Sequence, residues 1–159
     1  MLIIKISGII ILLFAGITIT SEIKKNNYAR LVRIEALIEL MRDVQLKIDC
    51  YALPIPEILA RCESRILVDC GISEGQCSSL KELYEKCAVR AESPEGKVLR
   101  EFCCNIGEGY RETEVKLCEK YIAEMNLLKT DYRSKLPKLN KASAVLCYFI
   151  LGVIIILII

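Results

Sequence analysis

The sequence predicts an all-α protein in which a helical bundle lies between an N-terminal and a C-terminal transmembrane helix. Three observations lead to this fold class: an apolar run near each end of the 159 residues, apolar side chains recurring every three or four positions between them, and no alternating pattern typical of strands. We therefore expect membrane helices over residues 1–21 and 142–159, and a helical bundle over residues 22–141.

The first apolar run extends from Leu2 to Thr20 and is interrupted only by Lys5, whose long side chain can reach the membrane interface. A cleaved signal peptide with residues 6–19 as its apolar core is the competing interpretation. The run carries a single lysine before its core, and no small-x-small cleavage pattern follows it. These features favour an uncleaved membrane anchor.

The stretch from Thr113 to Ile159 is amphipathic at first and apolar at its end. The helical pattern breaks at Pro137, where we expect a bend between domain and membrane, and after Lys141 the chain continues with 18 uncharged residues. At about 1.5 Å per residue these span about 27 Å, close to the ~30 Å hydrocarbon core of a bilayer. The stretch therefore predicts a soluble helix that leads into a membrane helix.

The flanking charges predict the orientation of the two anchors. Positively charged residues near membrane helices gather on the cytoplasmic side. The outer side offers only Lys5, so both termini are expected outside and the central domain in the cytoplasm. The inner flanks carry Lys24, Lys25, Arg30, Arg33, Lys129, Arg133, Lys135, Lys138 and Lys141.

The bundle is expected to contain five helices, of which the first is a long one from Lys24 to about Cys50. Proline restricts the residue before it, so Leu53–Glu57 should form a corner. Pro56 suits the first position of a second helix, which Gly71 can end.

The remaining three helices have recognisable N-terminal signals. Ser79 and Glu82 have the spacing of a capping box and should open the third helix. Ser93–Pro94 should open the fourth, which ends at Gly107–Gly109. The fifth is the amphipathic helix that begins near Thr113.

The residue content argues against several kinds of chemistry. The chain has nine cysteines and no histidine, which excludes histidine-dependent triads and histidine-containing zinc sites, and it has no Cys-x-x-Cys pair. Cys62, Cys87, Cys103 and Cys118 fall on predicted apolar faces, which favours packing in the core. We therefore expect no catalytic residue, no cofactor, no metal site and no small-molecule substrate.

The charge balance also argues against a nucleic-acid partner. Outside the two apolar runs the chain has 21 basic and 20 acidic residues, without a clustered basic face. A compact helical surface held close to a bilayer fits a docking subunit of a membrane complex better than an enzyme.

Two short segments carry a resemblance to the stage III sporulation protein AB family of endospore-forming bacteria. Pro54-Ile55-Pro56-Glu57 is similar to the family's Pro-Leu-Pro-Glu type corner, and Phe102 with Ile106-Gly107 is similar to a Phe-Gly-x-x-Leu-Gly type segment. The order of anchors, helices and corner resembles the family over the whole chain. The sequence departs from the family pattern at Cys103, Tyr110 and Glu114, where glycine, aspartate and glutamine are usual.

The resemblance implies a subunit of the complex built across the mother-cell and forespore membranes, required for endospore formation. The family's cytoplasmic domain is similar to the helical domains of type II secretion F proteins, which engage an ATPase. By that analogy the domain faces the mother-cell cytoplasm and docks the stage III sporulation protein AA ATPase, with other membrane proteins of the complex and the bilayer as further partners. The residues assigned to partner binding on this basis are Pro54, Pro56, Glu57, Phe102 and Gly107.

Two other function classes remain open at this point. A secreted cysteine-rich binding domain, tethered by its C-terminal helix, would form four disulfides and start near Ser21. A thiol or metal enzyme would require zinc or a strongly reactive cysteine.

Overall fold

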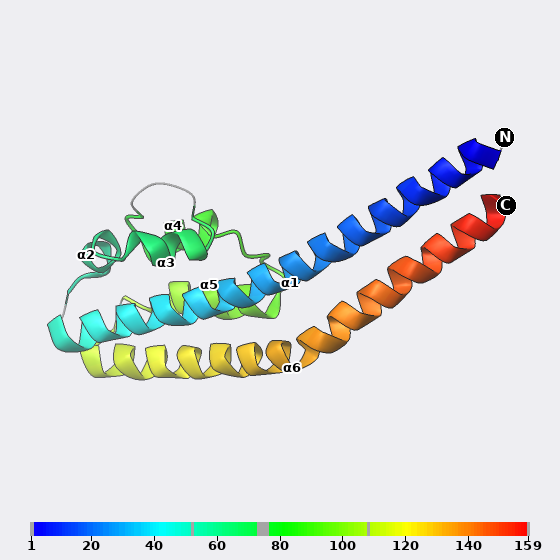
Figure 1. Ribbon diagram of the computed structural model, residues 1–159. Helices are drawn as coiled ribbons and strands as arrows, with labels where there is room; N and C mark the ends of the chain where they lie inside the picture. The colour runs from blue at the N-terminus through cyan, green and yellow to red at the C-terminus, as the bar shows by residue number, and fades with distance from the viewer. Residues whose placement is uncertain (1, 52, 73–76, 108, 159) are drawn as a thin grey trace. The chain divides into compact units, whose positions relative to one another are not determined.

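The structure is all-α, as predicted. It is a computed structural model that describes residues 2–51, 53–72, 77–107 and 109–158, and Glu108 of the predicted glycine turn lies outside these ranges. No strand occurs in the described ranges. The helices, shown in Figure 1, are α1 (Leu2–Tyr51), α2 (Ile55–Ala60), α3 (Ser64–Asp69), α4 (Leu80–Lys86), α5 (Pro94–Asn105) and α6 (Arg111–Ile158).

The chain divides into two compact units. Unit 1 comprises Met1–Arg30 with Tyr132–Ile159, and unit 2 comprises Leu31–Asp131. Charge is distributed unevenly between them: unit 1 has eight basic residues and one acidic residue, whereas unit 2 has 14 basic and 19 acidic residues. The near-neutral composition of the whole chain thus combines a basic unit with an acidic one.

The C-terminal part of α1 is the central element of unit 2. Figure 1 shows it between α3 and α4 on one side and α6 on the other. An apolar stripe with members three or four residues apart is buried from Ile34 to Ile48, and Ala36, Leu37 and Leu40 are buried as well. Because neighbouring helices cover both flanks, this part of α1 buries a wider surface than a single amphipathic stripe. Each fully buried leucine contributes about 1.5–3 kcal/mol of hydrophobic free energy.

The prediction of one helix from Pro56 to Gly71 is wrong, because the segment forms the two short helices α2 and α3. The chain leaves the helical conformation near Arg61 and is extended at Glu63, which has φ −62° and ψ 128°. Lys47 of α1 donates a hydrogen bond of 3.0 Å to the Arg61 carbonyl, which in a continuous helix would accept from a residue of the next turn. Gly71 does end α3, with φ +86°.

The caps predicted for α4 and α5 are present. The Ser79 hydroxyl accepts from the Glu82 N–H at 3.2 Å, and the Ser93 hydroxyl accepts from the Gly96 N–H at 3.1 Å. In a standard capping box the Glu82 carboxylate would accept from the backbone N–H of the cap residue, Ser79. Here it binds Ser78, one residue earlier, and accepts from the Ser78 N–H at 2.8 Å and the Ser78 hydroxyl at 2.7 Å.

Helix α6 continues through Pro137, so the amphipathic helix leads directly into the apolar segment, as predicted. A proline inside a helix removes one backbone hydrogen bond and costs about 3 kcal/mol. On α6, Cys118, Tyr121, Met125 and Leu136 are buried, whereas Pro137 is exposed. The packing of this apolar face therefore offsets the cost of the proline, and the helix runs unbroken to Ile158.

The two helical segments of unit 1 pack closely at Gly16. A Cβ at this position would lie 2.1 Å from Leu151 Cδ1, so only glycine allows the observed contact. Thr20 is buried beside it and donates its hydroxyl to the Gly16 carbonyl at 2.8 Å. Small residues permit this close approach, as is common between membrane helices.

Polar side chains also connect the two helical segments of unit 1, near the part of this unit that carries most of its charged residues. The Asn27 amide donates to the Asn140 side-chain oxygen at 2.7 Å, and the Tyr132 hydroxyl donates to the Asn27 carbonyl at 3.3 Å. The Arg30 guanidinium lies 4.8 Å from the centre of the Tyr132 ring, which provides a cation–π contact. The pair is therefore held by specific contacts as well as by apolar packing.

One helix among the described residues, over Arg111–Ile154, contains a window that is long and apolar enough to cross a membrane. The first apolar run is helical as well, and its side chains Phe14 and Ile17 are 67% and 55% exposed. The coarse fold is therefore an all-α chain with one candidate membrane helix, and the two-anchor arrangement stays a prediction.

Candidate partner-binding surface

The cysteines lie where core residues would lie. Cys87, Cys103 and Cys118 are buried, as predicted from their apolar faces, and Cys62 is half-buried. Burial raises the pKa of the Cys87 thiol from 9.0 to about 11, and that of Cys103 to about 12. These thiols stay protonated near neutral pH, which disfavours nucleophilic or metal-binding chemistry. The neighbouring Cys104 is exposed, so the two adjacent cysteines face different environments.

The proline corner precedes α2 and is rigid. Pro54 has φ −69° and ψ 148°, and its carbonyl accepts from the N–H groups of Glu57 at 3.0 Å and Ile58 at 3.1 Å. Pro56 occupies the first turn of α2. Backbone N–H groups in a first turn have no acceptor within the helix, so the absence of an N–H on proline costs no hydrogen bond there. The corner therefore presents Leu53, Pro54 and Ile55 on a backbone with little freedom.

The glycine turn between α5 and α6 is held by a buried carboxylate. Glu114, in the first turn of α6, is only 4% exposed. One of its oxygens accepts from the Gly107 N–H at 2.8 Å, and the other from the Gly109 N–H at 2.6 Å. The positive end of the helix dipole also favours a negative charge at this place. The Gly107 φ of +115° is a conformation that L side chains rarely adopt.

The corner and the turn meet, although they lie far apart in the sequence. A Cβ at Gly107 would lie 3.1 Å from Ile55 Cγ1. Between the two segments is a groove of about 230 Å³. It is lined by Ile48, Leu53, Pro54, Ile55, Gly107, Gly109, Arg111 and Glu114.

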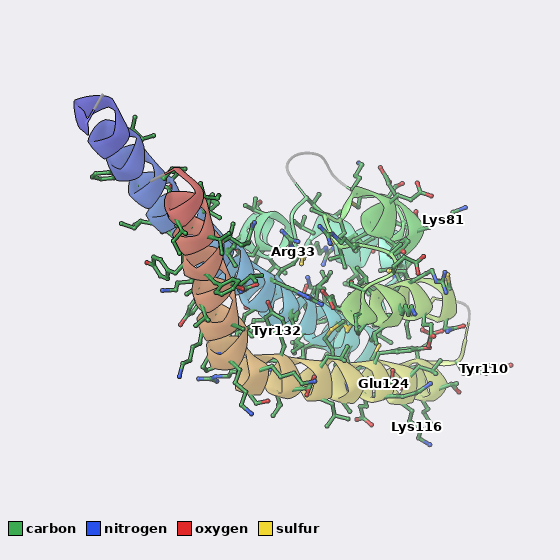
Figure 2. The ribbon with its side chains drawn as sticks, turned by 90° about the vertical axis from the view of Figure 1, so that its right-hand side faces the viewer. Arg33, Lys81, Tyr110, Lys116, Glu124 and Tyr132 are labelled. Atoms are coloured by element: carbon green, nitrogen blue, oxygen red, sulfur yellow. The ribbon has the colours of Figure 1, made fainter. Side chains whose placement is uncertain are left out.

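An exposed ion pair borders this groove. Arg111, at the start of α6, lies 2.9 Å from the Asp49 carboxylate of α1, and both side chains are more than half exposed. A second groove of about 490 Å³ extends from Asp49 and Arg111 along α6 to Glu119. Tyr110, immediately before α6, is 90% exposed, and Figure 2 shows its side chain pointing away from the helices. Tyrosine and arginine side chains are enriched in protein–protein interfaces.

The predicted partner-binding residues occupy three kinds of position. Pro54 and Gly107 line the groove. Pro56 is exposed on α2 outside the groove, and Glu57 forms an ion pair of 2.5 Å with Arg61 on the same helix. Phe102 is fully buried and packs edge-on against Tyr121, with ring centres 6.0 Å apart. The structure therefore brings two of the five together and places Phe102 in the core.

Nothing in the sequence indicated the ion pair between Asp49 and Arg111 that borders the groove. Their pairing joins the end of α1 to the start of α6, and no spacing along the chain indicates such a contact. Glu114 could have been noticed in the sequence. It is an acidic residue in the first turn of a predicted helix, four residues after Tyr110 and seven after Gly107. That signal identifies a capping group, but the double hydrogen bond to the glycine turn depends on the fold.

Comparison with known proteins gives one match. The family described as stage III sporulation protein AB matches residues 5–159, nearly the whole chain. No curated protein and no solved structure matches the chain. The family match confirms the resemblance carried by the proline corner and the glycine turn.

Proposed function

The chain belongs to the stage III sporulation protein AB family, and we propose that it is a non-enzymatic membrane subunit of the stage III sporulation complex between mother cell and forespore. In this role it acts as a platform of a secretion-like channel and is required for endospore formation. It docks the stage III sporulation protein AA ATPase on its cytoplasmic side.

The proposed topology has two membrane passes in the mother-cell membrane around the forespore. Its support is the helical pair of unit 1, whose outward faces are apolar, and the cations that border these faces. With the acidic unit 2 in the cytoplasm, the basic flanks lie on the side that the positive-inside tendency favours. The same topology keeps the cysteines in a reducing compartment.

One observation carries the docking proposal: the two segments by which the chain resembles its family meet at a single groove. The corner at Pro54–Ile55 and the turn at Gly107 form its walls, and Asp49, Tyr110 and Arg111 provide exposed charge and an aromatic ring beside it. We therefore assign this groove and its rim as the surface that contacts the ATPase.

Docking is tested by pull-down of the purified ATPase with full-length variants. Y110A and R111D should weaken binding at least tenfold, because hot-spot aromatic and arginine side chains each contribute about 2 kcal/mol or more. Their helicity by circular dichroism should stay unchanged, since both side chains are exposed. Loss of helicity together with binding would point to unfolding instead of a lost contact.

A matched control is R65D, which makes the same charge change on α3, where Arg65 is 83% exposed and outside the groove. R65D should bind the ATPase like the unchanged protein. Equal affinities of R65D and R111D, whether both normal or both weak, would contradict docking at the groove.

The topology is tested with a membrane-impermeant thiol reagent in intact cells. Cys50 and Cys104 are the informative reporters because both are exposed, whereas the buried cysteines would stay silent in either topology. Labelling only after permeabilisation is expected. Labelling in intact cells would place unit 2 outside and favour the secreted, tethered alternative.

A further inference from the structure

One face of α6 in unit 1 combines a broad apolar surface with two lysines at one end. A shallow, open hollow of about 690 Å³ lies against this face and is lined by Lys138, Lys141, Ala142, Val145, Leu146 and Phe149. The spacing of these positions places them on one side of the helix. Val145, Leu146 and Phe149 are 60–68% exposed, so this apolar surface is open to its surroundings.

The charge at the end of this face is entirely positive. From Tyr132 to Ile159 the sequence has four basic residues and no acidic residue. Within the described part of the chain, neither Lys138 nor Lys141 forms an ion pair. On the partner segment of unit 1 the one acid is Glu22, which does not line the face and is outnumbered by basic residues. The face therefore complements a ligand with an anionic head and an apolar tail.

The dimensions agree with such a ligand. Phe149 is eight residues from Lys141, a rise of about 12 Å along a helix. One leaflet of the ~30 Å hydrocarbon core is about 15 Å deep. A phosphate at the two lysines would therefore leave its acyl chain lying along the apolar residues as far as Phe149. The lysine ammonium is a compact charge that pairs well with phosphate.

From this arrangement we infer that the Lys138–Phe149 face binds an anionic phospholipid, with the headgroup phosphate at Lys138 and Lys141 and an acyl chain on Val145, Leu146 and Phe149. The inference rests on the proposed membrane insertion of α6. It adds a specific lipid site, which would fix the height and rotation of α6 at the membrane surface.

The chain has no tryptophan, so a single introduced indole reports on one place only. F149W places it within the face, and Y148W places it at the same depth, on a side chain that is 51% exposed and outside the face. Each variant of the full chain is reconstituted in bilayers of phosphatidylcholine and phosphatidylglycerol, with one lipid brominated at a time. Bromine quenches the indole only at contact, so the quenching ratio measures the lipid preference at each position.

The expected result is a preference for phosphatidylglycerol of at least about fivefold at F149W and none at Y148W. K138Q/K141Q should abolish the preference at F149W, because it removes both cations that attract the lipid phosphate. K24Q/K25Q removes the same charge from the other segment of unit 1, where both lysines are exposed, and should leave the preference unchanged. K138R/K141R keeps the charge and should retain the preference.

Four results would overturn the lipid site. Equal preference at both reporters would mean a diffuse attraction, as would equal losses in the two lysine double variants. Reversal by millimolar inorganic phosphate would mean that the lysines bind a free anion. Quenching by both lipids without preference refutes this inference alone, whereas no quenching by either lipid refutes the proposed membrane insertion itself.

Discussion

The carboxylate of Glu114 accepts a hydrogen bond of 2.8 Å from the backbone N–H of Gly107. This bond ties the end of α5 to the first turn of α6 and fixes the backbone that forms one wall of the candidate docking groove. Since Glu114 is almost fully buried, the bond is shielded from water and its loss is costly.

Glu114→Gln should lower the free energy of unfolding by about 1–3 kcal/mol. An amide offers one oxygen where two N–H groups require an acceptor, and its NH₂ group would face the second N–H. Urea denaturation of the full chain followed by circular dichroism measures the change. Glu112→Gln is the matched control on an exposed position of the same turn and should change stability by less than about 0.5 kcal/mol. Equal effects of the two variants would contradict the role of the buried carboxylate.

Gly107→Ala should destabilise unit 2 by about 1–3 kcal/mol, because a non-glycine residue at φ +115° is strained and its Cβ would press on Ile55. The groove would be displaced as well, so ATPase binding should fall with stability. Thermal unfolding of the full chain measures the first effect. Gly152→Ala, where an added Cβ meets nothing within 4 Å, should be neutral or slightly stabilising. A neutral Gly107→Ala variant would disprove the constraint at this turn.

The buried thiols should make the protein sensitive to alkali. Burial raises the pKa of Cys103 and Cys118 from 9.0 to about 12 in the folded state, so the unfolded chain binds fewer protons between these pH values. The stabilising contribution is complete below pH 9.0 and is lost towards pH 12. Each thiol then lowers the free energy of unfolding by about 1.4 kcal/mol per pH unit.

The C103A/C118A variant tests this pH dependence against the unchanged protein. Its urea midpoint should fall less steeply above pH 9.0, whatever its stability at neutral pH, because the variant lacks the two buried thiols. Parallel pH curves for the two proteins would refute the assignment of the raised pKa values to these thiols.

Gly16→Leu should disrupt the helical pair of unit 1, since even a Cβ at this position would lie 2.1 Å from Leu151 Cδ1. Leu151→Ala in the same chain should restore part of the lost thermal stability in detergent by making room for the larger side chain. Gly8→Leu is the control, because an added Cβ there meets nothing within 4 Å. If Gly8→Leu and Gly16→Leu were equally tolerated, the close contact at Gly16 would not hold the pair together.

The local features of the fold could be predicted from the sequence because their causes are local. Ser79 and Ser93 cap helices through bonds to residues three positions away, and Gly71 ends α3 by its own backbone freedom. The segment from Pro56 to Gly71 shows the limit of this reasoning. Its break at Arg61 involves Lys47 of another helix, a contact that no local pattern indicates.

The candidate site shows the same division. Pro54 and Gly107 could be selected from the sequence because they belong to the two segments that resemble the family. Their meeting in one groove, and the rim formed by Asp49 and Arg111, result from packing between distant segments. Phe102, which was assigned to partner binding from the same family segment, lies fully buried against Tyr121.

The sequence by itself determined the all-α class, most helix ends, the apolar runs with their basic flanks, and the family resemblance, because periodicity, capping and hydropathy act over a few residues. The tertiary structure decided which separate segments touch: the proline corner with the glycine turn, Glu114 with two backbone N–H groups, Gly16 with Leu151. It also decided that α6 continues through Pro137, because packing along a long helix offsets the loss of one backbone hydrogen bond.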